Sequence, residues 1–189
     1  MLSRIHPQEP ECTTYRFLGF CSLRAQRDRG RKARMNFRIS GLPAAQFESL
    51  FGLSDRILAD RGVVRRVADR KPGYPCRISL RDADVGESVL LLNYEHLAVN
   101  SPYRSRHAIY VREYAVEALL SVNEIPVALQ NRLLSVRALD DDGMMVDAEV
   151  VDGAKLAPIL NGYFADERVS YVHLHNAKPG CFAARVDRA

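Results

Sequence analysis

Residues 171–182 read Tyr-Val-His-Leu-His-Asn-Ala-Lys-Pro-Gly-Cys-Phe and predict a β-hairpin near the C-terminus. Side chains alternate between the two faces of a strand, so His173 and His175 point to the same side. Pro179-Gly180 suits the centre of a type II turn, where glycine supplies the positive φ. If the loop closes there, Cys181 falls opposite His175, and opposed residues on antiparallel strands share a face. The hairpin therefore predicts that two imidazoles and a thiol gather at one place.

Such a group of side chains supports three interpretations. In the first, His173, His175 and Cys181 bind a transition metal such as zinc, and His96 or Glu95 is the reserve for a fourth ligand. In the second, His175 activates the Cys181 thiol as a nucleophile, and the two form a catalytic dyad. In the third, the histidines are hydrogen-bonded sheet residues and Cys181 is a small buried hydrophobe.

A second candidate site would bind a small anionic molecule. The planar forks of Arg104 and Arg112 suit a carboxylate or a phosphate. Tyr103 and His96 complete this candidate ligand-binding set. The alternative is a solvated loop in which Arg112 is paired with a carboxylate.

Charge is distributed unevenly along the chain. The 189 residues carry a net charge of +4, and 47% of them are hydrophobic, enough for a sizeable core. Residues 1–34 hold eight Lys/Arg against three Asp/Glu, and the remainder holds 19 against 20. The body therefore lacks the basic surface that is typical of nucleic-acid binders.

The N-terminal segment is expected to differ from the rest. Residues 24–34 are basic and show no apolar periodicity, which predicts disorder. We expect residues 1–34 to be a basic, disordered extension and residues 35–189 to form a single globular domain. One hypothesis makes Met35 the natural start and the preceding residues an upstream extension or mobile tail. The rival hypothesis makes them an arm that binds nucleic acid or acidic lipid.

Cysteine usage and hydropathy indicate a compartment. The four cysteines form no CxxC pair, and the N-terminus shows no secretory signal. No apolar run approaches the roughly 18–20 residues that span a bilayer. We therefore expect a cytoplasmic protein with reduced thiols and no membrane association.

Hydrophobic patterning predicts seven or eight strands and two to four short helices, drawn from a slightly larger set of candidate segments. The strands are expected at 36–43, 63–67, 76–80, 88–94, 107–112, 133–139 and 144–150, followed by the terminal hairpin. Helical segments are expected at 44–51, 54–61, 114–123, 126–132 and 154–164. Ser54 is expected to cap the second of these, and Asp152 the last. There is no Gly-rich phosphate loop and no regular βαβ alternation. The prediction is an α+β fold, with a strongly bent, mostly antiparallel sheet or a small β-barrel.

Several segments together resemble one bacterial family. They are Gly73–Ala83, Gly86–Leu91, Tyr94–His96, Ser101–Arg104, Ile109–Glu113, Leu133–Ala138, Asp142–Met144 and His173–Cys181. They resemble the domain of unknown function 1203 family, over about residues 35–189. The resemblance implies no activity, because the function of that family is not established. It implies that six residues are typical of the family: Cys76, His96, Arg104, His173, His175 and Cys181.

The sequence thus leaves function unknown and whether the protein is an enzyme uncertain. The first hypothesis is a soluble domain whose His/Cys site on the terminal hairpin binds a metal or a small anionic ligand. The alternative is a non-catalytic structural or binding module, which could form a homodimer.

Overall fold

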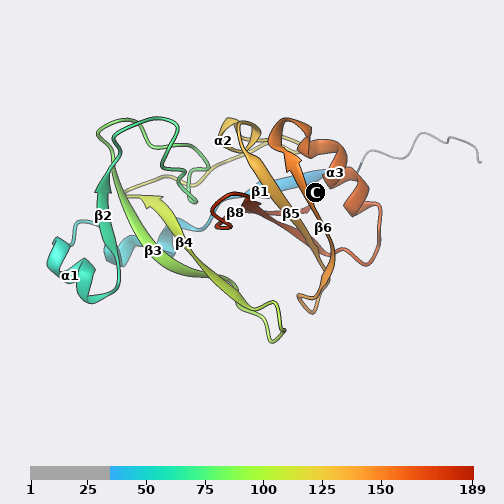
Figure 1. Cartoon of the computed structure of the whole chain (residues 1–189), viewed down its shortest axis with the longest axis horizontal. Coiled ribbons are helices and arrows are strands. Elements are labelled where there is room, and N and C mark those ends of the chain that lie inside the picture. The colour runs from blue at the N-terminus through green and yellow to red at the C-terminus, as the bar shows by residue number, and fades with distance from the viewer. Residues whose placement is uncertain (1–34) are drawn as a thin grey trace, which may run out of the picture. The chain divides into compact units, whose positions relative to one another are not determined.

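The computed structural model describes residues 35–189. Residues 1–34 lie outside the described part, and so do the predictions made for them. The described strands form two antiparallel sheets, which lie on the two sides of Figure 1. The smaller sheet has the order β2-β3-β4, with β2 (Val64–Val67), β3 (Ser88–Leu97) and β4 (Ser105–Arg112).

The larger sheet has five strands in the order β1-β8-β7-β5-β6. They are β1 (Phe37–Ser40), β5 (Leu133–Leu139), β6 (Met145–Asp152), β7 (Tyr171–Asn176) and β8 (Phe182–Arg188). The strands predicted at 133–139 and 144–150 pair as β5 and β6, and the predicted terminal hairpin is present as β7 and β8. The α+β class is confirmed, and the described strands form two sheets rather than a closed barrel.

The helices are short. They are α1 (Asp55–Asp60), α2 (Val127–Gln130) and α3 (Leu156–Phe164), with 3₁₀ turns η1 (Ala44–Gln46), η2 (Glu48–Leu50) and η3 (Gly153–Lys155). Two predicted caps are confirmed. The Ser54 hydroxyl accepts from the backbone N–H of Ile57 (3.5 Å), and the Asp152 carboxylate accepts from that of Ala154 (3.0 Å).

Three predicted elements were wrong. Residues 44–51 form two separate 3₁₀ turns in place of one helix, with Phe47 buried and Leu50 and Phe51 partly buried against the same apolar cluster. Residues 114–123 are irregular, since Tyr114 and Asn123 have positive φ values of 57° and 65° at the two ends. Residues 76–80 form turns with a single bridge from Cys76 to Tyr110.

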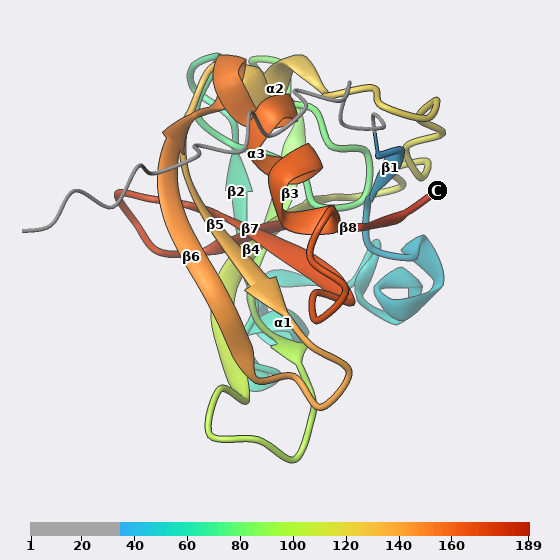
Figure 2. The same cartoon turned by 90° about the vertical axis from the view of Figure 1, so that its right-hand side faces the viewer.

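The larger sheet packs against α3 through one of its faces, as Figure 2 shows. Leu160 and Phe164 of α3 belong to the same buried cluster as Val172 and Leu174 of β7. A second apolar cluster joins the two sheets and contains Phe182 of β8 together with residues of β3 and β4. All six residues of β7 are buried, because α3 covers one face of the strand and the smaller sheet approaches the other.

None of the helices in residues 35–189 is long and apolar enough to cross a bilayer.

Candidate functional site

The two histidines of β7 share a face, as predicted. His173 and His175 are 2% and 0% exposed, and they point away from the α3 side that holds Val172 and Leu174. A buried polar side chain requires a partner, so what faces the two rings decides what they do.

Two more histidines face them from the smaller sheet. His107 lies on the same face of β4 as the buried Ile109 and Val111, and it pairs in register with Tyr94. The register shifts between Glu95 and Leu97, which makes His96 the extra residue of a β-bulge. The apolar inner face of the β3–β4 hairpin therefore ends in two imidazoles.

The ring of His96 lies against the other three, with centroids 4.9–5.4 Å apart, and we call His96, His107, His173 and His175 the histidine cluster. His96 Nε2 lies 2.8 Å from His107 Nδ1, and His96 Nδ1 lies 3.4 Å from His173 Nδ1. One ring nitrogen from each of His96, His107 and His175 lies within 4.8 Å of the other two. Phe182 stacks on His96, with ring centroids 4.8 Å apart.

The hydrogen bonds of His175 determine its tautomer. Its Nδ1 lies 2.9 Å from the carbonyl oxygen of Gly180, so Nδ1 carries the proton and donates it. Gly180 has the predicted positive φ, 73°, which shapes the loop that brings this carbonyl back over the strand. The other nitrogen, Nε2, is buried and has no hydrogen-bond partner among the described residues. It thus presents an unused lone pair.

The cluster favours neutral imidazoles. Burial lowers the pKa of His96 to about 4, of His173 to about 2 and of His175 to about 3. Burial also lowers the pKa of His107. The positive charge of Arg137 lowers the pKa of all four rings further. The neutral ring is the form that ligates metals.

A small cavity of about 20 Å³ lies against the cluster. His96, His173 and His175 line it together with Arg137 and Tyr103. About 10–15 Å³ is enough for one water-sized species. Two residues of the predicted anion-binding set therefore lie here: His96 belongs to the histidine cluster, and Tyr103 lines the small cavity beside it.

Cys181 does not join the histidines. The predicted register was wrong: Leu174 pairs with Ala184, and a bulge at Ala183 then sets Phe182, not Cys181, opposite His175. Cys181 Sγ instead accepts hydrogen bonds from Arg77 Nη2 (3.0 Å) and Asn176 Nδ2 (3.4 Å). The structure therefore separates the thiol from the group of histidine nitrogens with which it was predicted to act.

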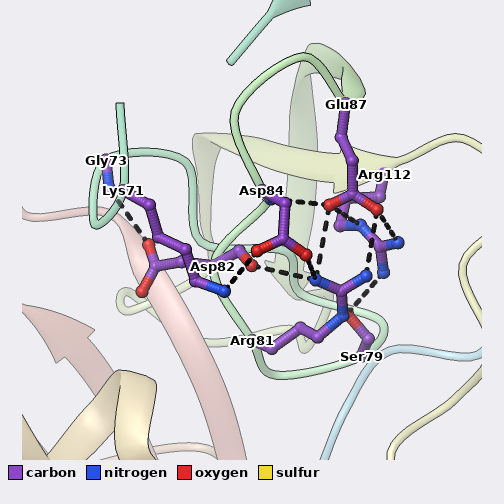
Figure 3. A network of polar contacts seen from close by, with 8 residues as sticks. All are labelled: Lys71, Gly73, Ser79, Arg81, Asp82, Asp84, Glu87 and Arg112. Atoms are coloured by element: carbon purple, nitrogen blue, oxygen red, sulfur yellow. Dashed lines mark hydrogen bonds and ion pairs between the residues drawn. The ribbon is translucent and has the colours of Figure 1, made fainter. Parts of the chain in front are cut away.

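Arg104 and Arg112 are both paired with carboxylates. Arg104, which is exposed, donates to Glu95 at 2.7 Å. Arg112 donates to both oxygens of Glu87, and Arg81 donates to the same carboxylate (Figure 3). This confirms the alternative interpretation of Arg112 as a paired residue.

The network of Figure 3 fixes the loop that follows β2, from residue 68 to residue 87. Lys71 and Arg81 both bond to Asp84, and the Asp84 N–H donates to Glu87. Within this loop, the Arg77 N–H donates to the Tyr110 carbonyl and the Arg77 carbonyl accepts from Leu42. Residue 41 must be glycine for that approach, since a Cβ there would lie 2.1 Å from the Ile78 oxygen. The loop thereby holds Arg77 beneath a larger cavity of about 590 Å³ that His107 and Cys181 also line.

Comparison with known proteins gives one match. The family model described as "Protein of unknown function (DUF1203)" matches residues 73–188, more than half of the chain. The chain belongs to this family. No curated protein and no solved structure matches it. In this DUF1203 protein, the matched segment contains all four clustered histidines, Arg77 and Cys181.

Three residues of the site were not predicted from the DUF1203 sequence in these roles. His107 is the first residue of the strand expected at 107–112, and alternation from Ile109 and Val111 places it on the inner face. Arg77 and Arg137 gave no recognisable signal. Arg77 lies in a loop that resembled a strand, and Arg137 meets His173 only through the β5–β7 pairing.

Proposed function

We propose that this protein binds a transition metal through His96, His107 and His175. The observation that carries the proposal is the buried His175 Nε2, which has a free lone pair and no hydrogen-bond partner among the described residues. Its other nitrogen donates to a backbone carbonyl, the usual second-shell arrangement of a metal-ligating histidine. Because the set is all imidazole, it suits zinc, copper, nickel or iron rather than calcium or magnesium.

The distances support this assignment. Three nitrogens around a tetrahedral zinc, each about 2.0–2.1 Å from the metal, lie roughly 3.4 Å from one another. The three ring nitrogens here are already within 4.8 Å. Binding requires His175 to approach and the 2.8 Å contact between His96 and His107 to open, both of which are small ring rotations.

His173 has a positioning role in this proposal. If His96 ligates through Nε2, its Nδ1–H is free to donate to His173 Nδ1, 3.4 Å away. Such a bond fixes the tautomer and the orientation of the ligating ring. The predicted pair of β7 histidines is thus divided between one ligand, His175, and one supporting residue, His173.

Three protein nitrogens leave a fourth tetrahedral position for water or for a ligand. A metal held in this way supplies Lewis-acid chemistry. His107 also lines the 590 Å³ cavity, so a small molecule in that cavity would lie beside the metal.

The proposal is tested by elemental analysis of the full chain, purified with an affinity tag that contains no histidine. We expect close to one equivalent of transition metal in the wild type and less than a tenth of that in His175→Ala. The matched control is His6→Ala, since His6 is the one histidine outside the cluster. Circular dichroism checks that His175→Ala is folded. A metal-free wild type whose thermal stability does not change on adding zinc would refute the proposal.

A purely structural cluster is the second candidate, and one observation favours it. The 2.8 Å bond between His96 and His107 and the stacking of His96 on Phe182 satisfy part of the cluster without any ion. This candidate predicts metal-free protein and no zinc effect, together with a loss of stability on replacing His96. The same elemental analysis therefore separates the two.

A further inference from the structure

The larger cavity is separate from the small one inside the histidine cluster. Its volume of about 590 Å³ falls in the range of small-molecule sites, roughly 300–1,000 Å³. Its polar lining residues include Arg77, Asn176, Lys178 and Cys181, and no Asp or Glu is among the described residues that line it. Leu91, Tyr110 and Leu133 provide apolar walls.

Arg77 is a buried cation without a carboxylate partner in residues 35–189. It is 2% exposed, and its guanidinium donates to the Phe182 carbonyl (2.8 Å), the Pro75 carbonyl and Cys181 Sγ. Guanidinium has five N–H groups, so one on each terminal nitrogen is left. Burial lowers the pKa of Arg77, because removing the guanidinium from water disfavours its charged form. An anion in the cavity would supply the missing counter-charge.

The neighbouring Arg132 shows what a compensated arginine looks like. It lines the same cavity, but both of its terminal nitrogens donate to the buried carboxylate of Asp82, at 3.0 and 2.6 Å. A guanidinium and a carboxylate of this kind form a bidentate pair. Arg132 therefore needs no ligand, whereas Arg77 does.

Asn176 adds a second unsatisfied group. The residue is 6% exposed and its Nδ2 donates to Cys181, but its buried Oδ1 has no partner among the described residues. Asn176 lines the cavity, so a small rotation of its amide would let a hydroxyl or amino group on the ligand satisfy this acceptor. A buried polar atom that lacks a partner is costly, so the pair formed by Arg77 and Asn176 specifies two complementary groups.

We propose that this cavity binds a small organic acid that carries a hydroxyl or amino group. The carboxylate lies on Arg77, with Lys178 at the entrance, and the donor group bonds to Asn176 Oδ1. The apolar remainder contacts Leu91, Tyr110 and Leu133. This site does not depend on the metal: His107 lines the same cavity, but none of the residues that would bind the acid is a proposed metal ligand.

Cys181 reports on the site directly, because its Sγ lies 3.0 Å from Arg77 Nη2. We would alkylate the full chain, after removing metals with a chelator, with iodoacetate or with its neutral analogue iodoacetamide. In both reactions the thiolate sulfur bonds to the CH₂ carbon and iodide leaves. Mass spectrometry of the Cys181 peptide gives the ratio of the two rates, and glutathione gives the reference ratio.

We expect the iodoacetate-to-iodoacetamide ratio at Cys181 to exceed that of glutathione by roughly tenfold or more, because a charge-assisted hydrogen bond holds the carboxylate. Lactate should protect Cys181, propionate should protect it less, and neutral lactamide should not. A ratio equal to that of glutathione would overturn the proposal. Equal protection by lactate and propionate would overturn the role of Asn176.

Variants locate the anion site. Arg77→Met should return the ratio to that of glutathione, and Lys178→Ala should lower it by a few-fold. Lys155→Ala is the matched control, since Lys155 is exposed and does not line the cavity. If Arg77→Met fails to fold, two measurements still test the anion site. They are the protection of wild-type Cys181 by lactate, propionate and lactamide, and the alkylation ratio of Lys178→Ala, which changes an exposed residue. Protection that survives unchanged in Lys178→Ala, with no preference for iodoacetate, would contradict the proposal.

Discussion

Two pairs of arginines in this molecule differ in what balances them. Arg81 and Arg112 both donate to the carboxylate of Glu87. Arg77 and Arg137, by contrast, form no ion pair among the described residues. Arg77 bonds to two backbone carbonyls and a sulfur, and Arg137 bonds through Nε to Ser135 Oγ at 3.4 Å.

The difference separates structure from candidate function. The first pair is satisfied inside the chain and holds a loop in place. The second pair lies against cavities and the histidine cluster, where burial lowers the pKa of both guanidinium groups. Charged groups with a shifted pKa beside a cavity are typical of functional sites, because a bound ligand can supply the opposite charge that the protein does not provide.

Acid should affect the two regions in different pH windows, and the histidine region should show the larger effect. In the unfolded chain the histidines bind protons below about pH 6.5, whereas in the folded protein His96 does so only near 4 and His175 near 3. The contribution of the neutral rings to the free energy of unfolding is therefore fully present above pH 6.5 and is lost as the pH drops. Between pH 6.5 and pH 5, the free energy of unfolding should fall by about 2 kcal/mol for each deeply buried ring. Urea unfolding of metal-free protein at pH 7, 6 and 5 measures this.

The matched variant for this prediction is His173→Phe, which keeps an aromatic ring but cannot bind a proton. Its stability should fall less steeply below pH 6.5, by about 1.4 kcal/mol per pH unit in the steep part of the window. His6→Ala is the control, and it should follow the wild type. A wild type equally stable at pH 7 and pH 5 would show that the rings are not held neutral.

Removing the Glu87 charge should destabilise the paired region by about 2 kcal/mol, because Arg112 and Arg81 lose a charged acceptor. Burial raises the pKa of Glu87, but hydrogen bonds from Arg112, the Asp84 N–H and Arg81 outweigh it and bring the pKa to about 2. The wild-type contribution is thus present above about pH 4.5 and is lost as the pH falls toward 2. Urea unfolding of Glu87→Gln at pH 7 measures the loss.

Glu48→Gln is the control for that measurement, since Glu48 is exposed. The Glu87→Gln variant should keep its metal content, because no member of the network in Figure 3 is a proposed metal ligand. Equal stability of the Glu87→Gln and Glu48→Gln variants would mean that the network contributes nothing measurable.

The sequence revealed local patterns better than distant pairings. Alternation at His173 and His175, the caps at Ser54 and Asp152, and the positive φ at Gly180 each depend on a few neighbouring residues, and each is confirmed. These features could be predicted because the period of a strand and the chemistry of a cap are local properties.

The site could be predicted only in part, because its geometry depends on long-range register. The pairing of β7 with β8 sets Phe182, not Cys181, opposite His175, and neither strand carries a signal for that register. His96, by contrast, follows the alternation of Leu90, Leu92 and Tyr94 along β3, so its inward side could be predicted, but the strand that faces it could not. A register error of one residue moves a side chain to the other face of the sheet. Alternation within one strand does not determine that register, so it cannot predict which residues of different strands meet in a site.

The charge of Arg137 should weaken metal binding. It lowers the pKa of every ring in the histidine cluster, and the same field opposes a divalent cation. Replacing it, as in Arg137→Met, should raise the affinity for zinc by roughly tenfold. Competition with a chromogenic chelator measures the change. The control is Arg106→Met, because Arg106 is exposed on β4. Unchanged affinity in Arg137→Met would place the metal away from this cluster.

The smallest effect is expected at Arg104. Its pair with Glu95 is short, 2.7 Å, but the Arg104 side chain is 60% exposed, and solvent screens such pairs. Arg104→Ala should therefore change the free energy of unfolding by less than about 0.5 kcal/mol and leave zinc affinity and the alkylation ratio of Cys181 unchanged. If lactate no longer protected Cys181 in Arg104→Ala, the anion site would include Arg104, as the sequence first predicted. Unchanged protection would show that an arginine already balanced by a carboxylate does not bind the ligand, whereas Arg77, which lacks one, does.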